Sequence, residues 1–279
     1  EIAQCLVGSE MCIRDSPYGM VQFTPSYFSK RSGFVINQLS GGGCEHMGNF
    51  PTFPVKGKLK MSPDNILNYR INISEEKGHA GYYEAMVQED IKAKLTVTER
   101  TGMASYEYPA DQQYGTVIIG GGISATPIEQ AAIVITAPNK CEGYAEGGNF
   151  CGLRTPYKVY FVAEFDTDAL ESGTWKRNEL KPNTTFAEGE YSGVYFTFDV
   201  NKKKNIQYKI GVSYVSVENA RENLKAENTG WDFLQIQNQA ESKWNHYLGK
   251  IEVEGTNPDR TTQFYTHLYR SFTRTYVVM

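Results

Sequence analysis

The sequence predicts a mainly β protein, an antiparallel β-sandwich followed by helices, and three observations predict it. The 279 residues are 13% aromatic, with 19 Tyr and 14 Phe beside 26 Gly and 11 Pro, and aromatic rings pack well on a pleated, half-buried surface. Apolar and polar residues alternate in several separate segments, which is the period of a strand with one solvated face. The connections carry turn residues and contain no amphipathic helix long enough for a crossover between parallel strands.

Period-two alternation dominates from about residue 59 to residue 217. It is clearest at residues 91–97, where Ile, Ala, Leu and Val alternate with Lys and Thr, and it returns at 159–165, 196–200 and 206–214. Turn residues stand between the segments, as in Pro109-Ala110-Asp111, Gly120-Gly121-Gly122 and Lys181-Pro182-Asn183. Strands joined by turns pair antiparallel, and their apolar faces must be covered, so we expect a second sheet packed on the first.

The pattern changes to a helical one after Val217. Apolar residues recur near helical spacing from Trp231 to Leu248, and Gly249 suits the end of a helix. A second helix should begin at Asn257-Pro258-Asp259, which provides an N-cap, a proline in the first helical position and a carboxylate in the first turn. Its apolar stripe consists of Phe264, Tyr265, Leu268 and Phe272. Because an apolar helix face needs a partner, we expect further helices beyond Met279.

These patterns divide the chain into four parts. Residues 17–217 form the sandwich, residues 218–256 a helical linker, and residues 257–279 the opening of a second, helical domain. Residues 1–16 show neither sustained alternation nor a capped helical repeat. We therefore expect them to be a non-native leader without a structural role.

The five cysteines do not form a zinc-binding or disulfide-rich pattern. Their number is odd and none has CxxC spacing, which argues against both a zinc site and a dense disulfide framework. Only Cys141 and Cys151 suggest a bridge, because they flank a glycine-rich stretch at 142–150 that we interpret as a loop. Two reduced thiols are an equally good interpretation, and the redox compartment would decide between them.

Charge and hydropathy exclude two classes of partner. The formal net charge of −4 provides no positive field to neutralise phosphates, so a nucleic acid is not expected as a partner. No stretch approaches the roughly 18 to 20 consecutive apolar residues that a bilayer span requires.

Several short motifs carry a more specific signal. They are Pro17–Pro25 (PYGMVQFTP), Gly33–Pro54 (GFVINQLSGGGCEHMGNFPTFP), and Gly81-Tyr82-Tyr83 followed by Leu95–Arg100 (LTVTER). The later part adds Gly230-Trp231-Asp232 and the run from Trp244 to Ile251. In this order and spacing the motifs resemble glycoside hydrolase family 92, and the resemblance covers about residues 17–279. Tyr18 stands where that family usually has Phe, a change that keeps an aromatic face.

The resemblance implies an exo-acting, inverting, calcium-dependent α-mannosidase. It implies a β-sandwich (supersandwich) packed against an (α/α)6 barrel, of which residues 257–279 would be the first helix. The implied partners are mannose-containing glycans, either N-glycans or mannan, and the chain's own C-terminal barrel. The implied location is periplasmic or extracellular.

The resemblance also implies that the catalytic residues and the calcium ligands lie mainly in the barrel. Inverting hydrolysis needs two carboxyl groups about 6.5 to 9.5 Å apart, and no segment singles out a pair among the 32 acidic residues. We therefore assign no catalytic and no metal-binding residue to this chain. We expect the chain alone to be inactive while its full-length parent is an enzyme.

The sandwich is expected to contribute one wall of the mannose pocket, through Tyr18, Gly19, Cys44 and Glu45. A tyrosine ring offers apolar surface to a sugar, and a glycine lets the backbone approach closely; the alternative for Tyr18 is a packed tyrosine in a turn. In the loop from Ser40 to Asn49, three glycines deliver Cys44, Glu45 and His46 together. Because successive side chains on an extended segment point to opposite faces, these three are not expected to form a metal site.

Two other functions compete with the enzyme. A free-standing carbohydrate-binding module would use the aromatic residues of the sandwich to stack on sugars. The two later helices argue against it, because a finished module would not expose the stripe containing Phe264, Leu268 and Phe272. A structural surface domain has only its β content in its favour.

Overall fold

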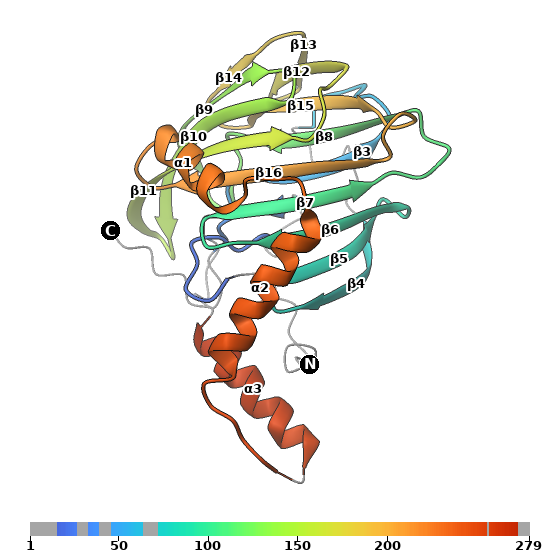
Figure 1. Ribbon diagram of the computed structural model, residues 1–279. Helices are drawn as coiled ribbons and strands as arrows, with labels where there is room; N and C mark the ends of the chain where they lie inside the picture. The colour runs from blue at the N-terminus through green and yellow to red at the C-terminus, as the bar shows by residue number, and fades with distance from the viewer. Residues whose placement is uncertain (1–15, 27–32, 39–45, 64–71, 256, 273–279) are drawn as a thin grey trace.

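Two antiparallel sheets stacked face to face, followed by helices, make up the fold (Figure 1). The computed structural model describes residues 16–26, 33–38, 46–63, 72–255 and 257–272. Within them, one sheet has seven strands in the order β1 (Thr24–Pro25), β2 (Phe34–Val35), β3 (Thr52–Lys56), β8 (Tyr114–Gly120), β15 (Ser192–Asp199), β12 (Glu171–Lys176) and β13 (Glu179–Pro182). The other has nine, in the order β14 (Phe186–Glu188), β9 (Ile128–Ala137), β10 (Lys140–Phe150), β11 (Leu153–Phe165), β16 (Asn205–Ser213), β7 (Thr101–Glu107), β6 (Ile91–Val97), β5 (Tyr82–Val87) and β4 (Ile73–His79).

The core lies between the two sheets and follows from the alternation in the sequence. In β6, Ile91, Ala93 and Leu95 are buried while Lys92 and Lys94 are half-exposed. Aromatic rings from both sheets meet in this core: Phe165 of the nine-stranded sheet lies 4.9 Å from Phe196 of the seven-stranded sheet, measured between ring centroids. The predicted antiparallel sandwich is confirmed.

Three helices follow the last strand within the described residues: α1 (Val217–Glu227), α2 (Phe233–Leu248) and α3 (Pro258–Phe272). Helix α1 lies across the outer face of the nine-stranded sheet, where Ala220 and Leu224 pack on Val162 of β11 (Figure 1). Helix α2 begins against β5, β6 and β7 and, with α3, extends beyond the edge of the sheet. The two helices pack on each other through Trp244 and Tyr269, whose ring centroids are 4.4 Å apart.

Local capping explains where the helices begin. The Ser216 hydroxyl accepts a hydrogen bond from the Asn219 backbone N–H at 3.1 Å, and the Asp232 carboxylate accepts one from the Gln235 N–H at 3.0 Å. Asn257 does the same for α3, accepting from the Asp259 N–H at 3.0 Å. Side-chain acceptors of this kind satisfy backbone donors that have no partner inside the helix. The helices predicted from Trp231 and from Pro258 are therefore present, and α1 falls in the part of the chain that was expected to be a helical linker.

Two local assignments from the sequence are wrong. Lys181 and Pro182 belong to β13 rather than to a turn, and the turn residue is Asn183, with φ of 61°. Residues 142–150 are not a loop but most of strand β10, which pairs with β9 and β11.

The position of Cys141 in this strand is incompatible with the proposed disulfide. Cys141 is a free thiol buried in β10, so the Cys141–Cys151 bridge is not formed. An extended strand rises about 3.3 Å per residue, which separates two cysteines ten positions apart by roughly 33 Å. A disulfide requires Cα atoms within about 7 Å of each other. Burial raises the pKa of the Cys141 thiol far above its usual range, which keeps it protonated.

No helix in the part of the chain that the structure describes has the length and hydropathy needed to cross a membrane.

Gly193 of β15 tests the packing within the seven-stranded sheet, where β15 lies between β8 and β12. A Cβ added there would lie 2.3 Å from the buried Trp175 ring and 2.4 Å from the Ile119 carbonyl oxygen, and neither atom can move freely in a close-packed core. Gly193→Ala should lower the free energy of unfolding by about 3 kcal/mol, measured by urea denaturation. The matched control is Gly230→Ala, where the nearest atom would be 4.0 Å away. Equal effects of the two substitutions would contradict this packing.

Candidate functional site

Gly19 lies in a tight turn that is pressed against the β6–β7 hairpin. Its N–H donates to the Ser16 carbonyl oxygen at 2.9 Å, and the next N–H, from Met20, donates to the Glu99 carbonyl oxygen at 2.7 Å. A Cβ on Gly19 would lie 2.9 Å from the Ser16 Cβ and 3.2 Å from the Glu99 oxygen. The glycine is therefore required for close approach to the protein's own backbone, since any side chain would force the turn outward.

Tyr18 lies where the sandwich meets helices α2 and α3. Its ring packs edge-on against Tyr247 of α2 at 5.7 Å and against Phe272 of α3 at 5.5 Å between centroids, an arrangement that aromatic pairs favour. Its N–H donates to the Phe272 carbonyl oxygen at 3.2 Å. Half of its surface, 50%, nevertheless remains exposed. Tyr18 thus joins the two parts of the chain and still presents an aromatic surface to the outside.

The other two predicted residues, Cys44 and Glu45, lie outside the described residues. The described end of the same segment, from His46 to Asn49, is tied to the sandwich by a buried polar network. Asn49 is fully buried; its N–H donates to Asn37 Oδ1 at 2.7 Å, and its own Oδ1 accepts from Tyr157 Oη at 2.9 Å. These two buried hydrogen bonds hold the segment in one conformation.

His46 belongs to the same network and has the surroundings of a packed histidine. Its ring packs on Phe150 at 5.0 Å and on Tyr157 at 5.5 Å, and its Nδ1 lies 3.3 Å from the Asn149 carbonyl oxygen. Burial lowers the pKa of His46, and the contact with Asn149 opposes part of that effect. The imidazole is therefore held in its neutral form and anchors the segment to strands β10 and β11.

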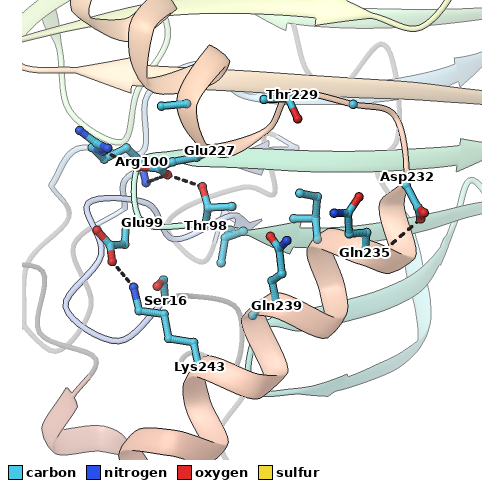
Figure 2. Close-up of a pocket in the computed structure, with 15 residues that line it drawn as sticks. Ser16, Thr98, Glu99, Arg100, Glu227, Thr229, Asp232, Gln235, Gln239 and Lys243 are labelled. Atoms are coloured by element: carbon cyan, nitrogen blue, oxygen red, sulfur yellow. Dashed lines mark hydrogen bonds and ion pairs between the residues drawn. The ribbon is translucent and has the colours of Figure 1, made fainter.

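The loop between β6 and β7 makes the most extensive polar contacts near Tyr18 and Gly19. Glu227, the last residue of α1, accepts hydrogen bonds from Thr98 Oγ1 at 2.5 Å, from the Arg100 backbone N–H at 2.9 Å and from Arg100 Nε (Figure 2). The Glu99 carboxylate forms an ion pair with Lys243 of α2. This loop therefore connects the sandwich to both α1 and α2.

A pocket of about 460 Å³ lies between this loop, the α1–α2 connection and α2 (Figure 2). Its lining includes the apolar residues Val97, Ile236 and Ala240 together with Glu99 and Glu227, whose carboxylates form ion pairs. The Glu99 carboxylate pairs with Lys243, and the Glu227 carboxylate pairs with Arg100 and accepts a hydrogen bond from Thr98. The pocket therefore lies at the junction between the sandwich and helices α1 and α2.

The contacts of Glu227 and Lys243 were not found from the sequence. Thr98, Glu99 and Arg100 stood out as part of a motif, but their partners lie more than 120 residues further along the chain. Nothing in the local pattern marks Glu227 or Lys243, which read as ordinary charged helix residues.

Calcium does not fit the residues that the structure describes. Among them, no group of three or more His, Cys, Asp or Glu side chains could hold a metal ion, whereas calcium takes six to eight oxygen ligands.

Two family models match the chain. The glycosyl hydrolase family 92 N-terminal domain matches residues 13–213, and the catalytic domain of the same family matches residues 219–278. The boundary between the two matches falls between β16 and α1.

Known proteins with similar sequences or folds are much longer than this chain. A protein of Arthroderma benhamiae described as a secreted glycosidase is 25% identical over 271 residues, covering 87% of this chain and 35% of that protein. A family 92 glycosyl hydrolase of known structure is 21% identical, with a TM-score of 0.85 over 98% of this chain and 41% of that one. An α-mannosidase of the same family from Bacteroides thetaiotaomicron is 22% identical, with a TM-score of 0.83 over 97% of this chain and 40% of that one. The chain thus spans about two fifths of the length of these relatives or less.

The burial of His46 predicts how stability depends on pH. Because the pKa of His46 is lower in the folded protein than its ordinary value of 6.5, the unfolded chain takes up a proton first as the pH falls. Stability should therefore decline as the pH falls below about 6.5 and level off below the folded pKa. His46→Gln should remove this part of the decline, measured by urea denaturation between pH 5 and pH 8.

The matched control for this measurement is His267→Gln, at an exposed histidine on α3. It leaves His46 in place and should keep the decline of the unchanged protein. A His46→Gln variant whose stability falls just as steeply would show that His46 is not the group responsible.

Proposed function

The chain belongs to glycosyl hydrolase family 92, and from this premise we propose that the protein carrying it removes terminal α-mannose residues from glycans. The proposed enzyme is exo-acting, inverting and calcium-dependent, and its substrates are mannose-containing glycans, either N-glycans or mannan. The proposal is supported by the match to both domains of the family and by two neighbours in fold from Bacteroides thetaiotaomicron, an α-mannosidase and an inverting mannosidase. A periplasmic or extracellular location is supported by the relative described as secreted.

The observation that carries the proposal is the place of the Tyr18–Gly19 turn. The turn lies against α2 and α3. Both helices belong to the segment that matches the family's catalytic domain. Tyr18 is half-exposed there, and an aromatic ring can pack on the apolar face of a sugar while polar groups bind its hydroxyls. In our proposal this turn is the sandwich's contribution to one wall of the mannose pocket, beside a C-terminal (α/α)6 barrel.

The proposal assigns the chemical step to residues outside those described. Inversion requires one protonated and one ionised carboxyl group about 6.5 to 9.5 Å apart, on opposite sides of the scissile bond. Glu99 and Glu227 form ion pairs with Lys243 and Arg100, respectively, and the proposal assigns neither of them to this step. The calcium ligands are likewise assigned elsewhere, since the described residues provide no cluster of ligands.

Release of mannose tests the proposal. The 279-residue chain alone should release mannose from a synthetic α-mannoside no faster than the same chain after heat inactivation. The longer protein containing it should release mannose at least about a thousandfold faster than the chain alone, because positioned acid–base groups and electrostatic stabilisation each contribute factors of this order. EDTA should abolish the activity of the longer protein, and added calcium should restore it.

The configuration of the released sugar gives a second readout. Proton NMR during the first minutes should show β-mannose as the initial product of an inverting enzyme. Turnover by the short chain, resistance of the long protein to EDTA, or initial release of α-mannose would each contradict a part of the proposal.

A further inference from the structure

One peptide group, between Glu99 and Arg100, is hydrogen-bonded at both of its ends. Its N–H, which belongs to Arg100, donates to Glu227 Oε2 at 2.9 Å. Its C=O, which belongs to Glu99, accepts from the Met20 N–H at 2.7 Å. A single rigid plane therefore stands between the end of α1 and the residue that follows Gly19.

The Glu227 carboxylate is held firmly at this position. Thr98 Oγ1 donates to one of its oxygens at 2.5 Å, and Arg100 Nε donates to the other. Thr98 in turn accepts from the Thr101 N–H at 3.1 Å, which closes the loop on itself. The Glu227 side chain is only 14% exposed, so water competes little for these donors.

The position of Glu227 at the end of its helix is unfavourable for a carboxylate by itself. It is the last residue of α1, where the helix dipole places partial negative charge and disfavours a carboxylate. The bonds to Thr98 and Arg100 offset that cost. A carboxylate on the N–H side also polarises the peptide group, which makes the Glu99 carbonyl oxygen a stronger acceptor for Met20.

We propose that Glu227 is a positioning residue for the Tyr18–Gly19 turn and acts on it through the Glu99–Arg100 peptide group. Charge at Glu227 strengthens the bond from Met20 to Glu99, and that bond holds the turn against the hairpin. Since Tyr18 of the same turn packs on Tyr247 and Phe272, the turn is fixed on both sides. The role in sugar binding rests on the proposed function; the relay itself does not.

Hydrogen exchange at the Met20 amide tests the relay in the 279-residue chain. Glu227→Gln keeps the size of the side chain and removes its charge, so it should speed exchange of the Met20 amide about tenfold, measured by NMR. The matched control is Glu222→Gln, the same change at an exposed position of α1, which should leave this amide unchanged. The Ile118 amide in the opposite sheet reports global opening and should also be unchanged.

Each outcome of this measurement decides the proposal. Faster exchange at Met20 alone supports the relay, whereas equal exchange in both variants, or uniform acceleration that includes Ile118, overturns it. If Glu227→Gln does not fold, Arg100→Lys removes only the Nε donor that orients the carboxylate and should give a smaller acceleration at Met20. No acceleration in a folded Arg100→Lys chain would then overturn the proposal.

Kinetics of the longer protein separate the relay from the proposed function. If the turn binds the sugar equally in the ground and transition states, Glu227→Gln should raise KM for an α-mannoside about threefold and change kcat less than about twofold. An altered exchange rate with an unchanged KM would leave the relay intact and count against the turn as a wall of the pocket. An unaltered exchange rate would overturn the relay whatever the activity of the enzyme.

Discussion

The peptide group between Glu99 and Arg100 is the constraint on which the junction between the sandwich and the helices depends. It joins three elements that are far apart in the sequence: the turn before β1, the β6–β7 loop and the end of α1. The side chain of Glu99 adds a fourth through its ion pair with Lys243 of α2. Because exposed ion pairs alone contribute little, the buried and charge-assisted bonds of Glu227 carry most of this connection.

The β6–β7 loop can connect these elements only if the strands on either side of it are rigid. Strands β6 and β7 pair over most of their length in the middle part of the nine-stranded sheet, and their inward side chains lie in the core between the sheets. The loop therefore needs little further ordering when α1 and α2 pack against it. The same sandwich fixes the Asn37–Asn49 network and, with it, the described end of the glycine-rich segment.

Features that depend on the spacing of apolar residues along the chain could be predicted from the sequence. Features that depend on packing between distant residues could not. Alternation in residues 91–97 identified β6, because one face of that strand is solvated. Helix α1 was expected only as part of a helical linker, without bounds of its own, because only Val217, Ala220 and Leu224 among its residues form an apolar stripe. Three residues are too few for a recognisable helical period. Strand β10 was taken for a loop because of its glycines, yet Gly143 is required there: a Cβ would lie 2.1 Å from the Ala132 carbonyl oxygen. Tyr18 and Gly19 were found from a motif, but their contacts with Glu99, Tyr247 and Phe272 join residues more than 75 positions apart.

A crystal structure of the longer protein with a bound mannose-based ligand would show whether the Tyr18–Gly19 turn is a wall of the sugar pocket. We expect the ring of Tyr18 or the backbone of Gly19 to lie within about 4 Å of the terminal sugar, the distance of a packing contact. A ligand bound in the same protein with no atom near this turn would contradict it.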